Sequence, residues 1–221
     1  MDQPPIDAGV TLWSQTEAER TDRPLLVLMH GYGADENDLF ALAPLLPDGF
    51  AYAAVRAPLT LPWPAPGFSW YPIDDVVDVQ LAGRDPARVT AAASAFVQWL
   101  DAAASPAQTI GMLGFSQGAS VALQALRLRP ERFAFAVNLS GYAAPGELPH
   151  DAELAAARIP VFWGRGARDD VIPPALVEHT AQWLPAHSDL SGRVYPELTH
   201  GVSEDELADV RAFLDKRLAA L

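Results

Sequence analysis

The sequence of 221 residues contains no cysteine. A thiol nucleophile, a disulfide framework and thiolate ligands for zinc are therefore excluded. Proteins of reducing compartments do without disulfides, and on this basis we expect a cytoplasmic protein.

Long apolar runs are missing as well. No window of the sequence approaches the roughly 18 consecutive apolar residues that identify a membrane span. The first residues, MDQPPIDAGVTLW, hold two acidic residues and two prolines before any apolar run, unlike a secretory signal peptide. We expect no stable insertion into a membrane.

Positive charge is scarce, with 15 Lys and Arg residues against 28 Asp and Glu residues and a formal net charge of −13. Such a surface repels phosphate backbones and anionic lipid headgroups. Nucleic acid is therefore not an expected partner, whereas neutral or cationic small molecules remain compatible with this charge.

Hydrophobic residues make up 50% of the chain, enough for one well-buried core, and we expect a single α/β domain over residues 1–221. Apolar runs of strand length alternate with helical patterns along the sequence. Strands are expected over 24–31, 50–58, 109–114, 133–141, 159–164 and 192–197, and helices over 35–46, 85–104, 117–129, 173–184 and 203–221. This alternation predicts a mostly parallel sheet with helices on both faces.

The stretch IGMLGFSQGASVALQAL, residues 110–126, places Ser116 between Gly114 and Gly118 where a strand passes into a helix. Gly-x-Ser-x-Gly in this context is the pattern of a nucleophile elbow, in which a sharp turn strains the serine and leaves room only for small neighbours. A plain strand-to-helix turn that needs glycine would give the same residues. The partners of Ser116 therefore decide between the two interpretations.

A serine hydroxyl needs a general base, and in folds with this elbow an acid and then a histidine follow the serine in sequence. Among the five histidines, His200 lies in a loop between the last predicted strand and the last helix. It is the expected base, because the carboxyl ends of parallel strands gather the chemistry of open α/β sheets. His179 falls in a predicted helix, His150 and His187 fall in polar segments, and none has metal-ligand spacing.

The orienting acid is expected after a strand that lies between these two residues in sequence. Asp169 and Asp170 both follow the predicted strand 159–164, and either can instead be a turn acid or a helix cap before Pro173. For an oxyanion hole, the backbone N–H of Gln117 is one expected donor, and Tyr32 or Gly33 of the loop HGYG is the other.

An aromatic loop, APLTLPWPAPGFSWYPID (residues 57–74), carries Trp63, Phe68, Trp70 and Tyr71 among five prolines. Proline stiffens a loop, and aromatic rings supply the apolar surface typical of small-molecule pockets. We expect Trp70 or Tyr71 to line the acyl or alcohol site. The alternative is that these rings only pack the loop onto the body of the protein.

The chain resembles the phospholipase/carboxylesterase family of small α/β hydrolases, which includes acyl-protein thioesterases and bacterial carboxylesterases. The similarity runs in order through LLVLMHGYGADENDL, AVRAP, GFSWYPID, LGFSQGASVAL, NLSGY, GRGARDDVIP and YPELTHGVS. It implies an α/β-hydrolase fold without a large lid domain. The family's His-Gly before the acid is Arg165-Gly166 here, and this change alters the surroundings of the pocket.

Carried over by this resemblance, Ser116 is the nucleophile, His200 the base and Asp169, four residues before the proline, the orienting acid. The backbone amides of Tyr32 and Gln117 form the oxyanion hole, and no metal or cofactor is implied. The implied activity is hydrolysis of carboxylic esters or thioesters of short to medium acyl chains through an acyl-enzyme. A lysophospholipase, a protein de-acylase or a peptidase with the same triad, and a non-catalytic ligand-binding protein on this fold, are the alternatives.

Overall fold

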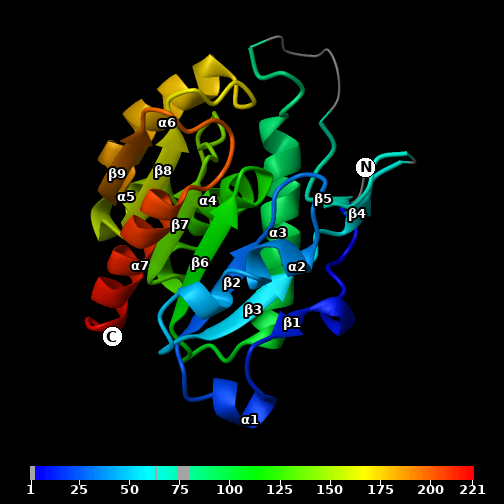
Figure 1. Cartoon of the computed structure of the whole chain (residues 1–221), viewed down its shortest axis with the longest axis vertical. Helices are drawn as coiled ribbons and strands as arrows, with labels where there is room; N and C mark the ends of the chain where they lie inside the picture. Colours follow the sequence, from blue (N-terminus) through cyan, green and yellow to red (C-terminus); the bar gives the residue numbers. More distant parts are fainter. Residues whose placement is uncertain (1–2, 63, 74–79) are drawn as a thin grey trace.

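The computed structural model describes residues 3–62, 64–73 and 80–221 (Figure 1). Its elements in chain order are η1 (Ala8–Val10), β1 (Leu12–Trp13), α1 (Glu17–Arg20), β2 (Leu25–Met29), α2 (Glu36–Phe40), η2 (Ala43–Leu45), β3 (Ala51–Val55), β4 (Leu59–Thr60), β5 (Phe68–Ser69), α3 (Pro86–Ala103), β6 (Ile110–Phe115), α4 (Gln117–Leu128), η3 (Pro130–Arg132), β7 (Phe135–Leu139), α5 (Asp151–Ala157), β8 (Pro160–Gly166), α6 (Pro174–His187), β9 (Asp189–Tyr195) and α7 (Glu204–Leu218).

A seven-stranded sheet in the order β1-β3-β2-β6-β7-β8-β9 forms the centre of the structure. Strand β1 pairs antiparallel with β3, and the other strands pair in parallel. The expected mostly parallel sheet is confirmed. Because the strands are parallel, the loops that follow β2, β6, β7, β8 and β9 meet at one edge of the sheet.

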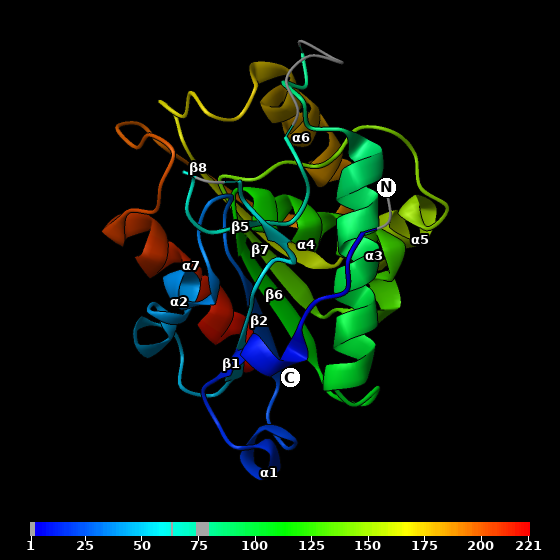
Figure 2. The same cartoon turned by 90° about the vertical axis from the view of Figure 1, so that its right-hand side faces the viewer.

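Helices cover both faces of the sheet, as Figure 2 shows with α2 and α7 on one side and α3, α4, α5 and α6 on the other. Alternate residues of β2 divide between the two cores, with Leu25 and Val27 packed in the larger and Leu26 and Leu28 in the smaller. All five residues of this strand are buried, as its continuous apolar run predicts. The arrangement is that of an α/β hydrolase, with no lid evident over the described residues.

Local signals place several helix ends correctly. The Asp85 side chain accepts a hydrogen bond from the Ala87 N–H at 2.9 Å and caps α3. The helix expected over 35–46 is shorter, because α2 ends at Phe40 and the chain continues as the 3₁₀ turn η2. Among the described residues, no helix has the length and apolar character needed to cross a membrane.

Several short elements were not expected from the sequence, among them β1, α5, β4 and β5. Strand β1 has only two residues, and α5 begins in a polar segment that reads as a loop. The hairpin of β4 and β5 folds the aromatic loop back on itself, and Phe68 also forms a bridge with Ala34 beside the end of β2. Trp63 of this loop, and its last residue Asp74, lie outside the described residues.

Candidate active site

Ser116 lies at the tight turn between β6 and α4, with a φ of 53° and a ψ of −115°. Positive φ is costly for a residue other than glycine. The flanking glycines fit this turn closely, since a Cβ on Gly114 would lie 2.5 Å from the Ala119 backbone and one on Gly118 would lie 2.1 Å from the carbonyl oxygen of Met29. The strained elbow geometry expected of the Gly-x-Ser-x-Gly stretch is therefore present.

His200 and Asp169 meet Ser116 at this edge of the sheet. The Nε2 atom of His200 is 2.9 Å from Ser116 Oγ, and its Nδ1 is 2.8 Å from Asp169 Oδ2. An ionised carboxylate only accepts hydrogen bonds, so Nδ1 carries the hydrogen and Nε2 is left to accept from the serine hydroxyl. Asp170 is exposed and lies outside this hydrogen-bonded chain.

The Asp169 carboxylate is fixed by its own loop. Its Oδ1 accepts hydrogen bonds from the backbone N–H groups of Val171 at 3.0 Å and Ile172 at 3.2 Å. Burial of Asp169 opposes its ionisation, but the hydrogen bonds from His200 and these backbone groups outweigh burial and hold its pKa below the usual value. The acid therefore stays charged beside the imidazole.

Gly166 brings the acid and histidine loops together. A Cβ at this position would lie 2.0 Å from the carbonyl oxygen of Leu198, so the two loops approach more closely than a side chain permits. The Arg168 N–H donates to the same carbonyl at 3.0 Å. The sequence therefore differs from the family's His-Gly only at Arg165, and it retains Gly166, the glycine that this contact requires.

Two backbone N–H groups lie next to the serine. Gln117 is the first residue of α4, where N–H groups have no acceptor within the helix. A Cβ on Gly31 would lie 3.5 Å from the Cβ of Ser116, which places the following residue, Tyr32, beside the elbow. No acceptor among the described residues bonds the Tyr32 N–H.

The side chain of Gln117 has a structural role that the sequence analysis did not predict. Its Oε1 accepts from the Trp70 N–H at 2.7 Å, and its Nε2 donates to the Tyr71 carbonyl at 2.7 Å. The residue after the serine thus holds the aromatic loop against the elbow. No local signal reveals this, because a glutamine at the start of a helix usually faces solvent.

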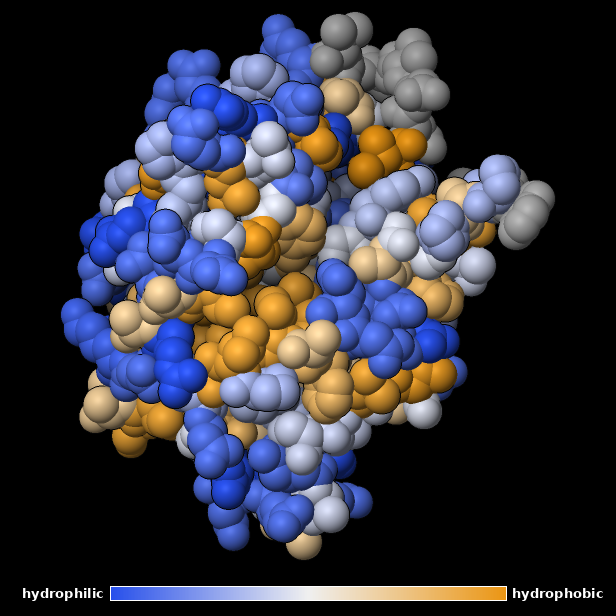
Figure 3. All heavy atoms as spheres, viewed as in Figure 1, coloured by the Kyte–Doolittle hydropathy of each residue, from blue (hydrophilic) through white to orange (hydrophobic). Residues whose placement is uncertain are grey.

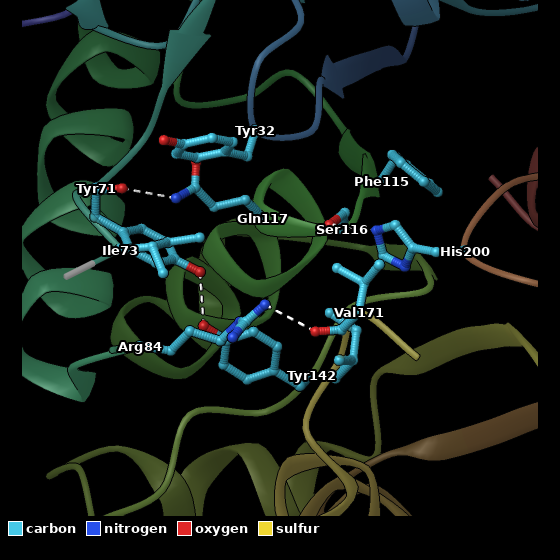
Figure 4. A pocket seen from close by; sticks show the side chains of 11 residues that line it. Tyr32, Tyr71, Ile73, Arg84, Phe115, Ser116, Gln117, Tyr142, Val171 and His200 are labelled. Atoms are coloured by element: carbon cyan, nitrogen blue, oxygen red, sulfur yellow. Dashed lines mark hydrogen bonds between the residues drawn. The ribbon is translucent and has the colours of Figure 1, made fainter. Parts of the chain in front are cut away.

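A pocket of about 190 Å³ opens over the serine (Figure 4). It is lined by Tyr32, Tyr71, Ile73, Arg84, Phe115, Ser116, Gln117, Tyr142, Val171, Ile172 and His200. Of the two aromatic residues expected here, Tyr71 lines the pocket and Trp70 does not, because the Trp70 ring is fully buried in the core. Arg84 and Tyr142 were not anticipated: Arg84 belongs to none of the motifs, and Tyr142 is the last residue of the NLSGY stretch, to which no part in the site was assigned.

A second hollow has a volume of about 270 Å³ and shares the lining residue Phe115 with this pocket. Its remaining lining residues are Asp38, Leu39, Leu42 and Val202. Figure 3 shows apolar side chains gathered between α2 and α7 on this face of the molecule. Phe115 therefore lines both a pocket with buried polar groups and a mainly apolar hollow.

The fold is that of the α/β hydrolases, and comparison with known proteins narrows the class. The chain belongs to the phospholipase/carboxylesterase family, whose model matches residues 15–218. This confirms the family resemblance and identifies a hydrolase family of esterases and thioesterases.

Individual relatives agree with this family. Acyl-protein thioesterase 1 of Debaryomyces hansenii is 33% identical over 113 residues, which cover 50% of this chain and 49% of that protein, so the match spans about half its length. The crystal structure of esterase PE8 is 28% identical, with a TM-score of 0.69 and coverage of 88% of this chain and 92% of that one. A carboxylesterase from Mesorhizobium loti shares the fold, with 22% identity, a TM-score of 0.75 and coverage of 96% and 99%.

Proposed function

We propose that this chain is a serine hydrolase of carboxylic esters with short to medium acyl chains. The observation that carries the proposal is the hydrogen-bonded chain from Asp169 through His200 to Ser116, with distances of 2.8 and 2.9 Å at a strained elbow. In this mechanism His200 Nε2 takes the hydroxyl proton while Ser116 Oγ bonds to the acyl carbon. The ester C–O bond then breaks, and the proton passes from His200 to the leaving alcohol.

Water completes the cycle by the same groups. His200 removes a proton from water, the resulting hydroxide bonds to the acyl carbon, and the bond to Ser116 Oγ breaks as that oxygen regains a proton. Asp169 holds the imidazole in the required tautomer and stabilises its cation. Its depressed pKa supports this role, because only the ionised carboxylate can do so.

The oxyanion of each tetrahedral intermediate is assigned to the N–H groups of Tyr32 and Gln117. Both lie beside Ser116, and neither is used by the protein's own hydrogen bonds among the described residues. The N-terminus of α4 adds partial positive charge at the same point. Removal of one such donor costs about 10² to 10³ in rate.

The size of the pocket supports short to medium acyl chains. A volume of about 190 Å³ covers only a few methylene groups, each worth about 0.8 kcal/mol when buried. The selectivity constant kcat/KM should therefore stop rising after a few carbons. A steady rise out to long chains would contradict this part of the proposal.

Thioesters of acylated proteins are a second candidate substrate, favoured by the curated relatives that carry the name acyl-protein thioesterase 1. The same nucleophile serves both reactions. Measurement of kcat/KM for an oxygen ester, a simple thioester and an S-acylated peptide of equal acyl length separates the candidates. A preference for the peptide of tenfold or more assigns the de-acylase reaction.

A covalent probe tests the nucleophile. An organophosphonate should add once to the peptide that contains Ser116, and Ser116→Ala should abolish both labelling and ester turnover. Ser140→Ala is the matched control, since Ser140 is also buried at a strand end with a φ of 50°. Turnover that survives in Ser116→Ala would overturn the mechanism, and a folded wild type without any turnover would favour a ligand-binding protein.

A further inference from the structure

The pocket over Ser116 contains a buried guanidinium group. Arg84 lies between the aromatic loop and α3, is only 8% exposed and lines the pocket together with Ser116 and His200. Its Nη2 donates to the Val171 carbonyl at 2.9 Å (Figure 4). Its Nη1 donates to the Ala82 carbonyl at 3.2 Å. The positive charge is therefore held in a fixed position by backbone groups.

Arg84 keeps hydrogen-bonding capacity after these contacts. A guanidinium group has five N–H donors, and the two backbone carbonyls occupy two of them. In the part of the chain that the structure describes, no carboxylate pairs with Arg84. The fully buried Arg127, by contrast, binds both oxygens of Asp151, and Arg56 pairs with Glu36.

The neighbours of Arg84 do not neutralise it. Tyr71 and Tyr142 share a hydrogen bond between their hydroxyl groups at 2.6 Å, on the wall of the same pocket. Burial raises the pKa of Tyr142 to about 12 and that of Tyr71 well above its usual value. Both side chains therefore stay uncharged near neutral pH, and among the described residues no negative charge offsets Arg84 in the pocket.

An unpaired buried charge is expensive unless a ligand supplies its partner. We propose that Arg84 binds a carboxylate carried by the substrate, so that the preferred esters are short and end in an ionised carboxyl group. This inference rests on the ester hydrolysis proposed above and specifies its substrate class. Arg84 matches a carboxylate well, because the planar guanidinium can form two parallel hydrogen bonds with it.

The size of the pocket limits the length of the chain that connects the carboxylate to the ester. The pocket volume is about 190 Å³. A carboxylate and a spacer of a few carbons fill it, as in the half-ester of a four- or five-carbon dicarboxylic acid. The net charge of −13 disfavours anions at long range, so recognition of the carboxylate depends on this local contact, which solvent ions screen less.

The test compares monomethyl glutarate with methyl valerate, which differ at the end of an equal carbon chain. In the wild type, kcat/KM for the anionic ester should exceed that for the neutral one by tenfold or more. Arg84→Met should lower this ratio at least tenfold, and Arg84→Lys should restore part of it. Arg168→Met is the matched control, since Arg168 is exposed and pairs with the exposed Glu197, and its ratio should equal that of the wild type.

A purely structural role of Arg84 predicts a different result. If the residue only anchors Val171, Arg84→Met lowers kcat/KM for both esters equally, and the proposal is overturned. A wild type that prefers methyl valerate would overturn it as well. Hydrolysis of methyl valerate through Ser116 without any anion preference defeats this inference alone, whereas loss of all Ser116-dependent turnover defeats the proposed function.

Binding provides a readout that needs no turnover. Calorimetry on Ser116→Ala should detect glutarate, and the additional Arg84→Met substitution should abolish that binding. Binding of inorganic phosphate without glutarate would overturn the assignment of a carboxylate.

A second pair of esters shows which side of the substrate carries the carboxylate. The valerate ester of glycolate has the carboxylate on the alcohol side, and ethyl valerate has none. An Arg84-dependent preference for the glycolate ester assigns the pocket to the alcohol side and supports the contact.

Discussion

The indole N–H of Trp70 donates a hydrogen bond to the backbone carbonyl of His30, and the nitrogen and oxygen atoms are 2.8 Å apart. This bond ties the aromatic loop to the end of β2, directly before the loop that carries Tyr32. The Trp70 side chain is fully buried among residues of the larger core. Trp70 therefore supports the loop that carries Tyr32, the proposed oxyanion donor, and does not line the pocket over Ser116.

Substitution of Trp70 is accordingly expected to act on stability. Trp70→Ala should lower the free energy of unfolding by about 3–5 kcal/mol, as truncation of a buried aromatic side chain does. Urea denaturation measures this effect, with Val194→Ala as an exposed control that stays within about 0.5 kcal/mol of the wild type. If Trp70→Ala keeps full stability but changes the dependence of kcat/KM on acyl length, Trp70 acts in the pocket after all.

Substitutions of the neighbouring residues Asp169 and Asp170 should have very different effects on turnover. Asp169→Asn should lower kcat by up to about 10⁴, because an amide favours the wrong tautomer of the histidine. Asp170→Asn should have little effect, since this side chain is exposed and outside the hydrogen-bonded chain. Steady-state kinetics with one neutral ester compares them, and equal losses in both variants would contradict the assignment of Asp169.

Glu206 in the first turn of α7 should make stability depend on pH. Its side chain is fully buried, and burial raises its pKa to about 7, although the backbone N–H of Ser203 opposes the shift; Asp209 adds to it. The unfolded chain ionises this group at a lower pH than the folded protein does, so stability falls as pH rises from about 4.5 to about 7. At 1.36 kcal/mol per pKa unit, the loss amounts to about 3 kcal/mol.

Glu206→Gln removes this titration. The free energy of unfolding of the variant, minus that of the wild type, should increase between pH 4.5 and pH 8 and then stay constant. Glu204→Gln is the matched control, because Glu204 is exposed on the same helical turn. A difference that is independent of pH in Glu206→Gln would show that the group is ionised throughout.

Asp151 should contribute strongly to the stability of the segment that follows β7. Its carboxylate binds the buried Arg127 guanidinium at 2.8 and 2.7 Å, and Arg127 in turn donates to the carbonyls of Ala144 and Gly146. Asp151→Asn leaves the buried charge without compensation and should cost about 3–5 kcal/mol. Thermal unfolding measures the loss, and Glu153→Gln, an exposed change on the same helix, should be nearly neutral.

The sheet and the long helices were predictable because their signals are local. Strand β2 is a continuous apolar run, and α3 begins at an aspartate followed by proline, which is a strong start signal. Helix α5 was missed because its first residue, Asp151, acts through Arg127, which lies 24 positions earlier in the sequence. Such a contact leaves no periodic pattern to detect.

The candidate site divides in the same way. The flanking glycines indicate Ser116, and the position after the last strand indicates His200, so both residues could be proposed from the sequence. Arg84 has no motif, and its place in the pocket depends on a hydrogen bond to Val171, 87 residues further along the chain.

The separation of Ser116 and His200 by 84 residues has a consequence for how the chain acquires activity. Between them lie β7, β8 and β9, which occupy successive places in the sheet, so all three must be paired before the histidine lies beside the serine. Contacts over such distances form late, because closing a long loop costs entropy before any contact compensates for it. During refolding, helical circular dichroism should therefore return first, and ester turnover should return only with the addition of the edge strand β9.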